Sequence, residues 1–330
     1  MKKKRLLMLF TICTWLVGCE KLDEPDHLVP KTADQDSSIP SIKINDRVLH
    51  SEVFGDPDDT LIICIHGGPG ADYRYMLAAK DLAQYGYKVV FYDQVGSGLS
   101  QRFNENYYSG KDLDDIFLNE LDAVIDFYKT RPNQKVVLFG HSWGAILATS
   151  YAGKKPNEID GMILIEPGGL KWNDIEEYIK KAQAAPLGSE ILNDILFQDQ
   201  FVSTKKDNHE ILDYKFALIA SHGSPNTLET LTGKDSFWRF GSVINLTSFN
   251  YGQKFKPDMG QGIENFQDKV LFMYGGAGKV YSDEWARKIS YVYKNKELVK
   301  IEGVGHSGML ESDKWRSVTL PSVLNYLKTI

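Results

Sequence analysis

Short, predominantly apolar runs recur along the chain, and amphipathic stretches separate them. Each run is four to seven residues long, which is the pattern of a strand buried on both faces of a sheet. A strand exposed on one face would instead alternate apolar and polar residues. The runs that predict strands are Thr60–Ile65, Tyr87–Tyr92, Val136–Phe139, Ile159–Ile165, Lys269–Tyr274 and Leu298–Ile301.

Several stretches between the runs carry apolar residues at helical spacing. The longest, from Asp112 to Thr130, gathers its apolar residues on one face of a helix. Ahead of the first run, the weak alternation from Ser41 to Phe54 predicts a β-hairpin that turns at Asn45 and Asp46. This alternation of strands and helices predicts an α/β fold, with a mostly parallel sheet flanked by helices.

The alternation stops between residues 170 and 256. This segment is helical in pattern and rich in aromatic residues, and it follows the sixth predicted strand when the hairpin counts as two. We interpret it as an insertion into a core formed by residues 41–169 and 257–330. More than half of its aromatic side chains are expected to form the insertion's own core.

The first 18 residues predict an export signal. Residues 2–5 are basic, and the apolar segment 6–17 is too short to cross a membrane. The sequence LVGC at 16–19 resembles the lipobox of bacterial lipoproteins, whose cysteine becomes the acylated N-terminus of the mature protein. We therefore expect Cys19 to anchor the chain in a lipid bilayer of the bacterial envelope, with the outer membrane as the expected site. The alternative is an ordinary secretory signal in which Cys19 is incidental.

The segment that follows predicts a disordered tether. Residues 19–40 are polar and acidic and contain proline. Their acidic start resembles the export signal of surface lipoproteins in Bacteroidetes-type bacteria.

The net charge argues against one class of partner, and the cysteine content argues against disulfide bonds. Without the four basic residues of the signal, the 38 basic residues of the chain become 34 against 44 acidic ones, a net charge of −10. This charge argues against nucleic acid as a partner. Once Cys13 leaves with the signal and Cys19 carries lipid, only Cys64 remains, so no intrachain disulfide is expected. Cys64 lies in an apolar run and is expected to be buried. The sequence contains no metal-ligand cluster or phosphate loop, so we expect neither a metal nor a cofactor.

The most informative stretch is KVVLFGHSWGAILATSY at 135–151. An apolar strand leads into Gly-x-Ser-x-Gly, and apolar residues at helical spacing follow. This is the pattern of a nucleophile elbow, a turn so tight that the serine is strained and side chains at both glycine positions would collide. Ser142 would then stand at a helix N-terminus, where developing negative charge is favoured. The alternative is an ordinary strand-to-helix turn.

Two glycine-rich motifs precede the elbow, each at the end of a predicted strand. They are HGGPG at 66–70 and DQVGSGLS at 93–100. With GHSWG they resemble, in order and spacing, the α/β-hydrolase superfamily and, within it, the proline iminopeptidases, which carry HGGPG, DQRGSGRS and GGSWG. The chain departs from that pattern at Val95, which replaces an arginine, and at His141, which replaces a glycine.

The resemblance implies a catalytic arrangement. The oxyanion hole would consist of the N–H groups of Gly68 and Trp143; Gly67 is the other candidate in the first loop, because Pro69 has no N–H. His306, in a glycine-flanked loop between the last strand and a C-terminal helix at 313–328, would be the catalytic base. The segment at 170–256 would be a helical cap over the substrate.

The third member of the expected triad is missing from its usual place. The family acid follows the seventh strand, but this register places Gly278 there. Glu166, directly after the sixth strand, is one replacement, as in pancreatic-type lipases. Asp283 is a second, although a carboxylate in the first turn of a helix is already favoured by the helix dipole. The third interpretation is that the acid is lost.

These observations lead to one expected function and two alternatives. We expect a serine hydrolase that uses Ser142, His306 and Glu166, and the resemblance implies an aminopeptidase that removes an N-terminal residue, preferentially proline. Such an enzyme needs carboxylates in the cap for the substrate ammonium group, and Glu176, Glu177, Glu229 and Asp235 are available. The alternatives are an esterase or lipase of small acyl substrates, and a non-catalytic lipoprotein that binds a ligand.

Overall fold

The chain forms a single eight-stranded sheet. The structure is a computed structural model that describes residues 28–108, 112–182, 208–221, 237–278 and 280–330. The strand order in these residues is β1-β2-β4-β3-β5-β6-β7-β8. β2 pairs antiparallel with β1 and β4, and the other neighbours are parallel. The strands are β1 (Ser41–Ile44), β2 (Arg47–Phe54), β3 (Thr60–Ile65), β4 (Tyr87–Tyr92), β5 (Val136–His141), β6 (Gly161–Ile165), β7 (Val270–Gly275) and β8 (Lys296–Ile301).

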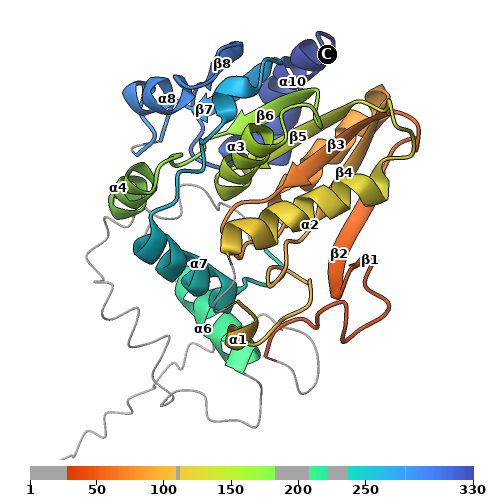
Figure 1. Cartoon of the computed structure of the whole chain (residues 1–330), viewed down its shortest axis with the longest axis vertical. Coiled ribbons are helices and arrows are strands. Elements are labelled where there is room, and N and C mark those ends of the chain that lie inside the picture. Colours follow the sequence, from red (N-terminus) through yellow and green to blue (C-terminus); the bar gives the residue numbers. More distant parts are fainter. Residues whose placement is uncertain (1–27, 109–111, 183–207, 222–236, 279) are drawn as a thin grey trace, which may run out of the picture.

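Helices cover both faces of the sheet (Figure 1). On one face, α2, α3 and α8 pack against strand residues such as Ile63 and Leu138. On the other face, η1 and α10 pack against the alternate residues, such as Ile62 and Val137. The helical elements that flank the sheet are η1 (Arg74–Tyr85), α2 (Leu113–Tyr128), α3 (Trp143–Lys154), α8 (Asp283–Ser290) and α10 (Leu320–Leu327). Burial on both faces explains why the central strands are continuously apolar.

Shorter helical elements connect the strands or lead into the C-terminal helix. They are α1 (Glu105–Tyr108), η2 (Ile263–Asn265), η3 (Gly308–Leu310), α9 (Ser312–Lys314) and η4 (Trp315–Thr319). The single helix expected at 313–328 is therefore α9, η4 and α10 in succession, in which η4 is a π-helical turn. The predicted α/β fold and its opening hairpin are confirmed.

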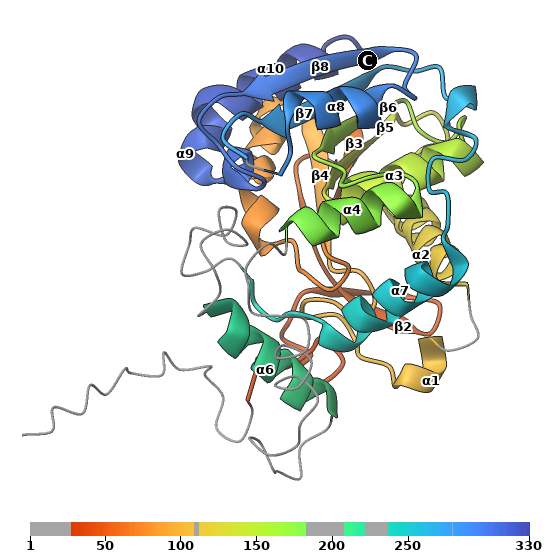
Figure 2. The same ribbon diagram turned by 90° about the vertical axis from the view of Figure 1, so that its left-hand side faces the viewer.

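The described parts of the segment 170–256, called the cap segment below, are mostly helical. They are α4 (Trp172–Ala182), α6 (Asn208–Ser221) and α7 (Ser242–Phe255). In Figures 1 and 2, α6 and α7 lie at the end of the molecule away from β6, β7 and β8. The Ser242 N–H donates to Asp213 Oδ1 at 2.9 Å, and the Ser242 hydroxyl donates to the Leu212 carbonyl at 3.1 Å. These bonds join α6 to the start of α7.

The predicted tether is wrong for residues 28–40. Val29, Thr32 and Ala33 are buried. The Ala33 N–H donates to the Leu99 carbonyl at 2.8 Å, and Arg239 Nη1 donates to the Pro30 carbonyl at 2.9 Å. The composition of this segment does not predict its burial, because its few apolar residues pack against segments that lie far away in the sequence. Cys19 and the predicted signal lie outside the described residues.

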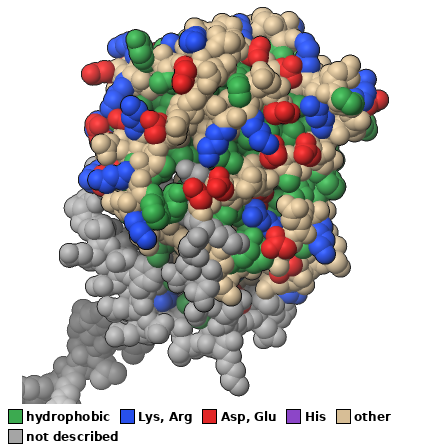
Figure 3. Space-filling view, viewed as in Figure 1, with side chains coloured by type: hydrophobic (Ala, Val, Ile, Leu, Met, Phe, Trp, Pro, Cys, Tyr) green, Lys and Arg blue, Asp and Glu red, His purple; other side chains and the backbone are tan. Residues whose placement is uncertain are grey.

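Surface charges of both signs are interspersed on the face shown in Figure 3. Of the helices that the structure describes, none is both long and apolar enough to cross a membrane. Cys64 is fully buried in β3, as expected, and burial raises the pKa of its thiol.

Candidate active site

Ser142 occupies a strained turn between β5 and α3. Its backbone has φ 53° and ψ −116°, and its N–H donates to the Ile165 carbonyl at 2.8 Å. A Cβ at Gly140 would lie 2.4 Å from the Gly144 carbonyl oxygen. A Cβ at Gly144 would lie 2.0 Å from the Ile65 carbonyl oxygen. Only glycine fits at these two positions, so the sequence forces the sharp turn that displays the serine.

His306 and Glu166 meet across two loops at the carboxyl end of the sheet. Glu166 Oε2 lies 2.6 Å from His306 Nδ1, and Glu166 Oε1 accepts the Gly275 N–H at 2.6 Å. The Glu166 side chain is 1% exposed, whereas that of His306 is 19% exposed. Both oxygens of the carboxylate thus have hydrogen-bond partners, and the group is shielded from water, whereas the imidazole is accessible to solvent. These contacts fix Nδ1 of His306 as the protonated nitrogen and leave Nε2 as the base.

The loop that carries Glu166 is held in an unusual backbone conformation. Glu166 has a φ of +44°, and its N–H donates to the Met273 carbonyl at 3.1 Å. The next two carbonyls are also bound: Pro167 accepts from the Tyr281 hydroxyl and Gly168 from Trp285 Nε1, both at 3.0 Å. A left-handed conformation is uncommon outside glycine, asparagine and aspartate, and it is maintained here by contacts with the segment 273–285.

The geometry favours Glu166 over the other two interpretations of the missing acid. Asp283 begins α8 and pairs with Lys300 Nζ at 3.1 Å, so it does not reach His306. The hydrogen bond from Lys300 lowers the pKa of this carboxyl. Loss of the acid is contradicted by Glu166, which lies within hydrogen-bond distance of the histidine.

The HGGPG loop runs directly against the serine. A Cβ at Gly67 would lie 3.3 Å from Ser142 Cβ. The Gly67 N–H already donates to the Tyr75 hydroxyl at 2.7 Å, and Pro69 has no N–H. Gly68 is therefore the residue of this loop whose N–H is left for an incoming oxygen. Trp143 is the first residue of α3, so its N–H has no intrahelical acceptor.

His141 links this loop to the loop of His306. Nδ1 of the neutral His141 ring accepts from the Tyr75 hydroxyl at 2.8 Å, because the other ring nitrogen faces a carbonyl and must donate. His141 Nε2 then donates to the His306 carbonyl at 3.0 Å. Burial and the neighbouring His306 lower the pKa of His141 well below its ordinary value, so this imidazole is neutral. The histidine that departs from the family pattern thus joins two loops of the site.

The DQVGSGLS loop supports the elbow from the other side. Trp143 Nε1 donates to Gln94 Oε1 at 2.9 Å, and the Gln94 N–H donates to His66 Nε2 at 3.0 Å. Burial lowers the pKa of His66, in keeping with its role as a neutral acceptor. Val95, where the family has arginine, is fully buried in the core.

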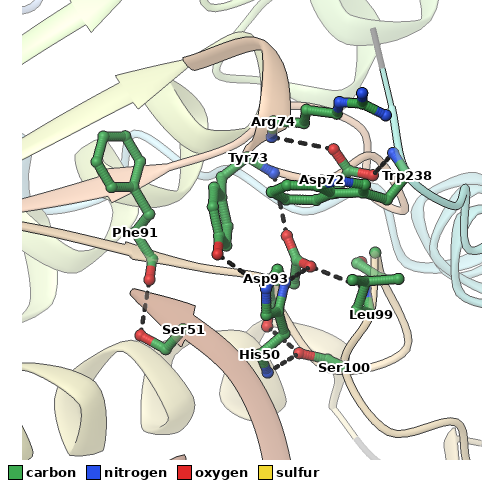
Figure 4. Close-up of polar contacts among 12 residues, drawn as sticks. His50, Ser51, Asp72, Tyr73, Arg74, Phe91, Asp93, Leu99, Ser100 and Trp238 are labelled. Atoms are coloured by element: carbon green, nitrogen blue, oxygen red, sulfur yellow. Dashed lines mark hydrogen bonds and ion pairs between the residues drawn. The ribbon is translucent and has the colours of Figure 1, made fainter. Parts of the chain in front are cut away.

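Asp93 fixes the path of that loop (Figure 4). Its carboxylate accepts from His50 Nδ1 at 2.7 Å, from the Tyr73 N–H at 3.0 Å and from the Leu99 N–H at 2.8 Å. Asp93, the residue that begins the motif, therefore has a structural role.

The sequence model of one family, described as serine aminopeptidase, S33, matches residues 56–230, which is more than half of the chain. The chain belongs to this family. The match includes the three glycine-rich motifs and Glu166, and it ends before His306.

Members of the serine aminopeptidase S33 family and related proteins share sequence with this chain over different lengths. The chain is 36% identical over 105 residues to the proline iminopeptidase of Saccharolobus solfataricus, which covers 31% of this chain and 32% of that protein. It is 25% identical over 292 residues to the proline iminopeptidase PfmaB of Pestalotiopsis fici, covering 82% and 94%. The chain thus spans about a third of the length of the proline iminopeptidases of Saccharolobus solfataricus and Thermoplasma volcanium.

Among solved structures, a membrane phospholipase A, described as a bacterial virulence factor, superposes with a TM-score of 0.61 and 16% identity. The alignment covers 88% of this chain and 86% of that one. At this identity the likeness shows the shared fold.

Tyr178, from α4, reaches the site although no sequence motif marks it. Its hydroxyl lies 3.2 Å from His306 Nδ1. A Cβ at Gly168 would lie 2.7 Å from the Tyr178 ring, so this glycine makes room for the tyrosine over the Glu166 loop. The sequence also does not predict the role of Tyr75. Both tyrosines lie in amphipathic helical segments, where an aromatic residue indicates only packing.

The cap carboxylates expected near the serine are partly accounted for. Glu176 pairs with Lys180 at 3.1 Å, and Glu177 pairs with Lys181 at 2.7 Å, both on the surface of α4. Hydrogen bonds from these lysines lower the pKa of each carboxyl. Glu229 and Asp235 lie outside the described residues. Within the described part of the chain, no three histidine, cysteine or acidic residues form a group that could hold a metal.

Proposed function

We propose that this protein is a serine hydrolase that works through an acyl-enzyme. The observation that carries the proposal is the 2.6 Å contact between the buried Glu166 and His306 Nδ1, at the same edge of the sheet as the strained Ser142. Unlike the buried structural pair of His50 and Asp93, this pair has an imidazole that is 19% exposed, and its glutamate is held in a left-handed conformation. Nucleophile, acid and base follow the chain order Ser, Glu, His, and the acid precedes its usual position by one strand.

In the proposed reaction Ser142 Oγ attacks the acyl carbonyl and His306 Nε2 accepts its proton. Glu166 keeps the proton on Nδ1 and stabilises the imidazolium that forms. The N–H groups of Gly68 and Trp143 bind the oxyanion, and each such donor stabilises the transition state by about 3 kcal/mol. His306 then protonates the leaving group, and water releases the acyl chain by the reverse sequence. The chemistry requires no metal or cofactor.

The substrate we propose is a peptide with an N-terminal proline or similar residue. The support is the family, the three motifs shared with proline iminopeptidases, and the proline iminopeptidases among the curated relatives. Recognition of the free imino group would fall to a carboxylate of the cap segment, and Glu229 and Asp235 remain candidates.

A second candidate is an esterase of small acyl substrates. One observation favours it: among the described residues of the cap segment, Tyr178 contacts the triad, while Glu176 and Glu177 are paired with lysines on the surface. A site without an acidic cap residue would bind uncharged acyl groups better than an ammonium group.

The decisive experiment uses the protein from residue 20 onward, a fluorophosphonate probe, and two substrates, L-proline β-naphthylamide and p-nitrophenyl acetate. Wild type should label at one site, and Ser142→Ala should not label or turn over either substrate while keeping the wild-type melting temperature. The control Ser150→Ala, on the buried side of α3, should label normally. Residual turnover by Ser142→Ala would overturn the nucleophile, and a wild type that does not label would favour a non-catalytic binding protein. The ratio of the two substrate rates separates peptidase from esterase.

We further propose that Cys19 is acylated and holds the protein in the bacterial envelope. The support is the sequence LVGC after a basic and apolar leader. Wild-type cells grown with a clickable palmitate analogue should label the protein, and Cys19→Ser should abolish both labelling and membrane fractionation. Labelling of the variant would contradict the proposal.

A further inference from the structure

The HGGPG loop at 66–70 is attached to the cap segment by hydrogen bonds. Gly70 accepts the Gly241 N–H on its carbonyl at 2.6 Å, and the Pro69 carbonyl accepts from Asn245 Nδ2 at 2.7 Å. These two acceptors follow Gly68 directly in the chain. The donors come from the start of α7, so the loop that would present the Gly68 N–H is held from the cap side.

The next acceptor along the chain, Asp72, strengthens this attachment. Its Oδ2 accepts the N–H groups of Trp238 and Arg239, at 2.6 and 3.0 Å, and its Oδ1 accepts the Arg74 N–H at 3.0 Å (Figure 4). The carboxylate is fully buried between the two segments. One oxygen therefore binds the cap segment and the other binds the core.

The fit between these segments leaves little space. A Cβ at Gly70 would lie 2.5 Å from the Gly241 carbonyl oxygen, and a Cβ at Gly241 would lie 1.9 Å from the Gly96 carbonyl oxygen. The beginning of α7 is thus wedged between the HGGPG loop and the DQVGSGLS loop. A displacement of α7 cannot occur without moving residues 69–72 or breaking their hydrogen bonds.

We propose that Asn245 is a positioning residue for the oxyanion hole. Its amide holds the Pro69 carbonyl and thereby the direction of the Gly68 N–H. Because Asn245 belongs to α7, this direction depends on the position of α7 on the core. The chemical reason is that oxyanion donors act only when they are aimed in advance at the developing charge. Gly68 is backbone-flexible, with a φ of +123°, so its N–H direction depends on the bonds made by the residues after it. The docking of the cap helix α7 therefore sets the rate of the chemical step, in addition to covering the substrate.

This inference rests on the proposed function, and the experiment separates the two. The test variant is Asn245→Asp, which keeps the shape of the side chain but replaces the N–H donor by an oxygen facing the Pro69 carbonyl. The control is Asn250→Asp, the same change at an exposed position of the same helix. The readouts are kcat and KM for p-nitrophenyl acetate, and the inhibition constant of phenylboronic acid, whose tetrahedral adduct places an oxygen in the oxyanion hole.

For Asn245→Asp we expect kcat to fall about tenfold or more, with KM within about twofold of wild type. The inhibition constant of the boronic acid should rise by the same factor as kcat falls, because both report binding of the tetrahedral oxygen. Asn250→Asp should match wild type in all three values. A merely structural defect would lower the fraction of active enzyme, as counted by the fluorophosphonate, without changing kcat per labelled site.

An unchanged kcat per site in Asn245→Asp would overturn the inference, as would a loss of kcat without weaker boronic acid binding. Should that variant not fold, Asn245→Ala decides by the same criteria, with an expected loss of about threefold or more in kcat. A wild type that neither labels nor hydrolyses the ester would instead reject the proposed function itself.

Discussion

Glu166 lies 2.6 Å from His306 Nδ1 although 140 residues separate the two in the chain. The contact arises because β7 lies between β6 and β8, and the loop that follows β8 crosses the end of β7 towards β6: a Cβ at Gly275 would lie 2.4 Å from the Val304 carbonyl oxygen. The Gly275 N–H at the end of β7 completes the arrangement by binding the other carboxylate oxygen. A glutamate, with one methylene more than an aspartate, reaches the imidazole from this neighbouring strand.

The first prediction concerns this acid. Glu166→Gln should lower kcat by about 10³- to 10⁴-fold, because the amide cannot stabilise the imidazolium and would favour the wrong tautomer. The rate of fluorophosphonate labelling measures the same loss. Asp283→Asn is the matched control for the alternative acid and should stay within about twofold of wild type, since Asp283 pairs with Lys300. The opposite order of effects would identify Asp283 as the acid.

The second prediction concerns Tyr178. Its hydroxyl is 3.2 Å from His306 Nδ1, whose hydrogen already points to Glu166 at 2.6 Å, so the tyrosine makes the weaker of two contacts. Tyr178→Phe should therefore reduce kcat by less than about threefold, whereas Tyr178→Ala should cost more because it removes the ring that covers the Glu166 loop. Steady-state kinetics on both variants checks this order. Equal losses would show that the hydroxyl, and not the ring, is what the site uses.

The third prediction compares two glycines. Gly144→Ala should destabilise the fold by about 3 kcal/mol or more, because the new Cβ would lie 2.0 Å from a backbone oxygen that cannot move freely. Gly86 has a positive φ, of +82°, which Gly144 does not, but nothing lies within 4 Å of the added Cβ. Gly86→Ala should then cost only about 1–2 kcal/mol of backbone strain. Urea unfolding of the two variants measures both values, and similar losses would argue against the clash.

The fourth prediction is a pH dependence of stability that arises from His141. Burial first, and His306 second, lower the pKa of this residue well below about 6.5, the value expected in the unfolded chain. Below pH 6.5 the unfolded chain therefore binds a proton that the folded chain does not, and the free energy of unfolding falls as the pH falls. One such group contributes a slope of at most about 1.4 kcal/mol per pH unit.

Urea unfolding at pH 7.5 and 5.5 tests this dependence. His141→Gln should lose less stability between the two pH values than wild type does, by about 1 kcal/mol, even if it is less stable at pH 7.5. His66, whose pKa is lowered by burial in the same way, supplies a similar slope in both proteins and cancels in the comparison. Identical slopes would mean that His141 takes up its proton in the folded state as well.

The sequence predicts the parts of the site that depend on local geometry. Gly140, Ser142 and Gly144 belong to one turn, whose close contacts leave room only for glycine at 140 and 144. Glu166 could be proposed from its place after a strand, but its contact with His306 depends on strand order. The roles of Tyr178 and Asn245 could not be predicted from the sequence. Their partners lie about 130 and 180 residues away, and the spacing of apolar residues in a helix does not indicate distant partners. The error over residues 28–40 has the same origin, since burial there depends on a surface formed by other segments.

The packing of residues 28–33 also limits how the enzyme can be oriented. If Cys19 carries the proposed lipid, only residues 20–27 separate it from Leu28, whose N–H donates to Glu210 Oε1 of α6 at 2.5 Å. Eight residues span at most about 29 Å when fully extended. The start of α6 would then stay within about 29 Å of the lipid surface, with the β6–β8 side of the sheet farther from it (Figures 1 and 2). Substrates would reach Ser142 through the narrow layer of solvent beside the membrane, so the enzyme would sample the peptides or esters present in that layer rather than those in the bulk.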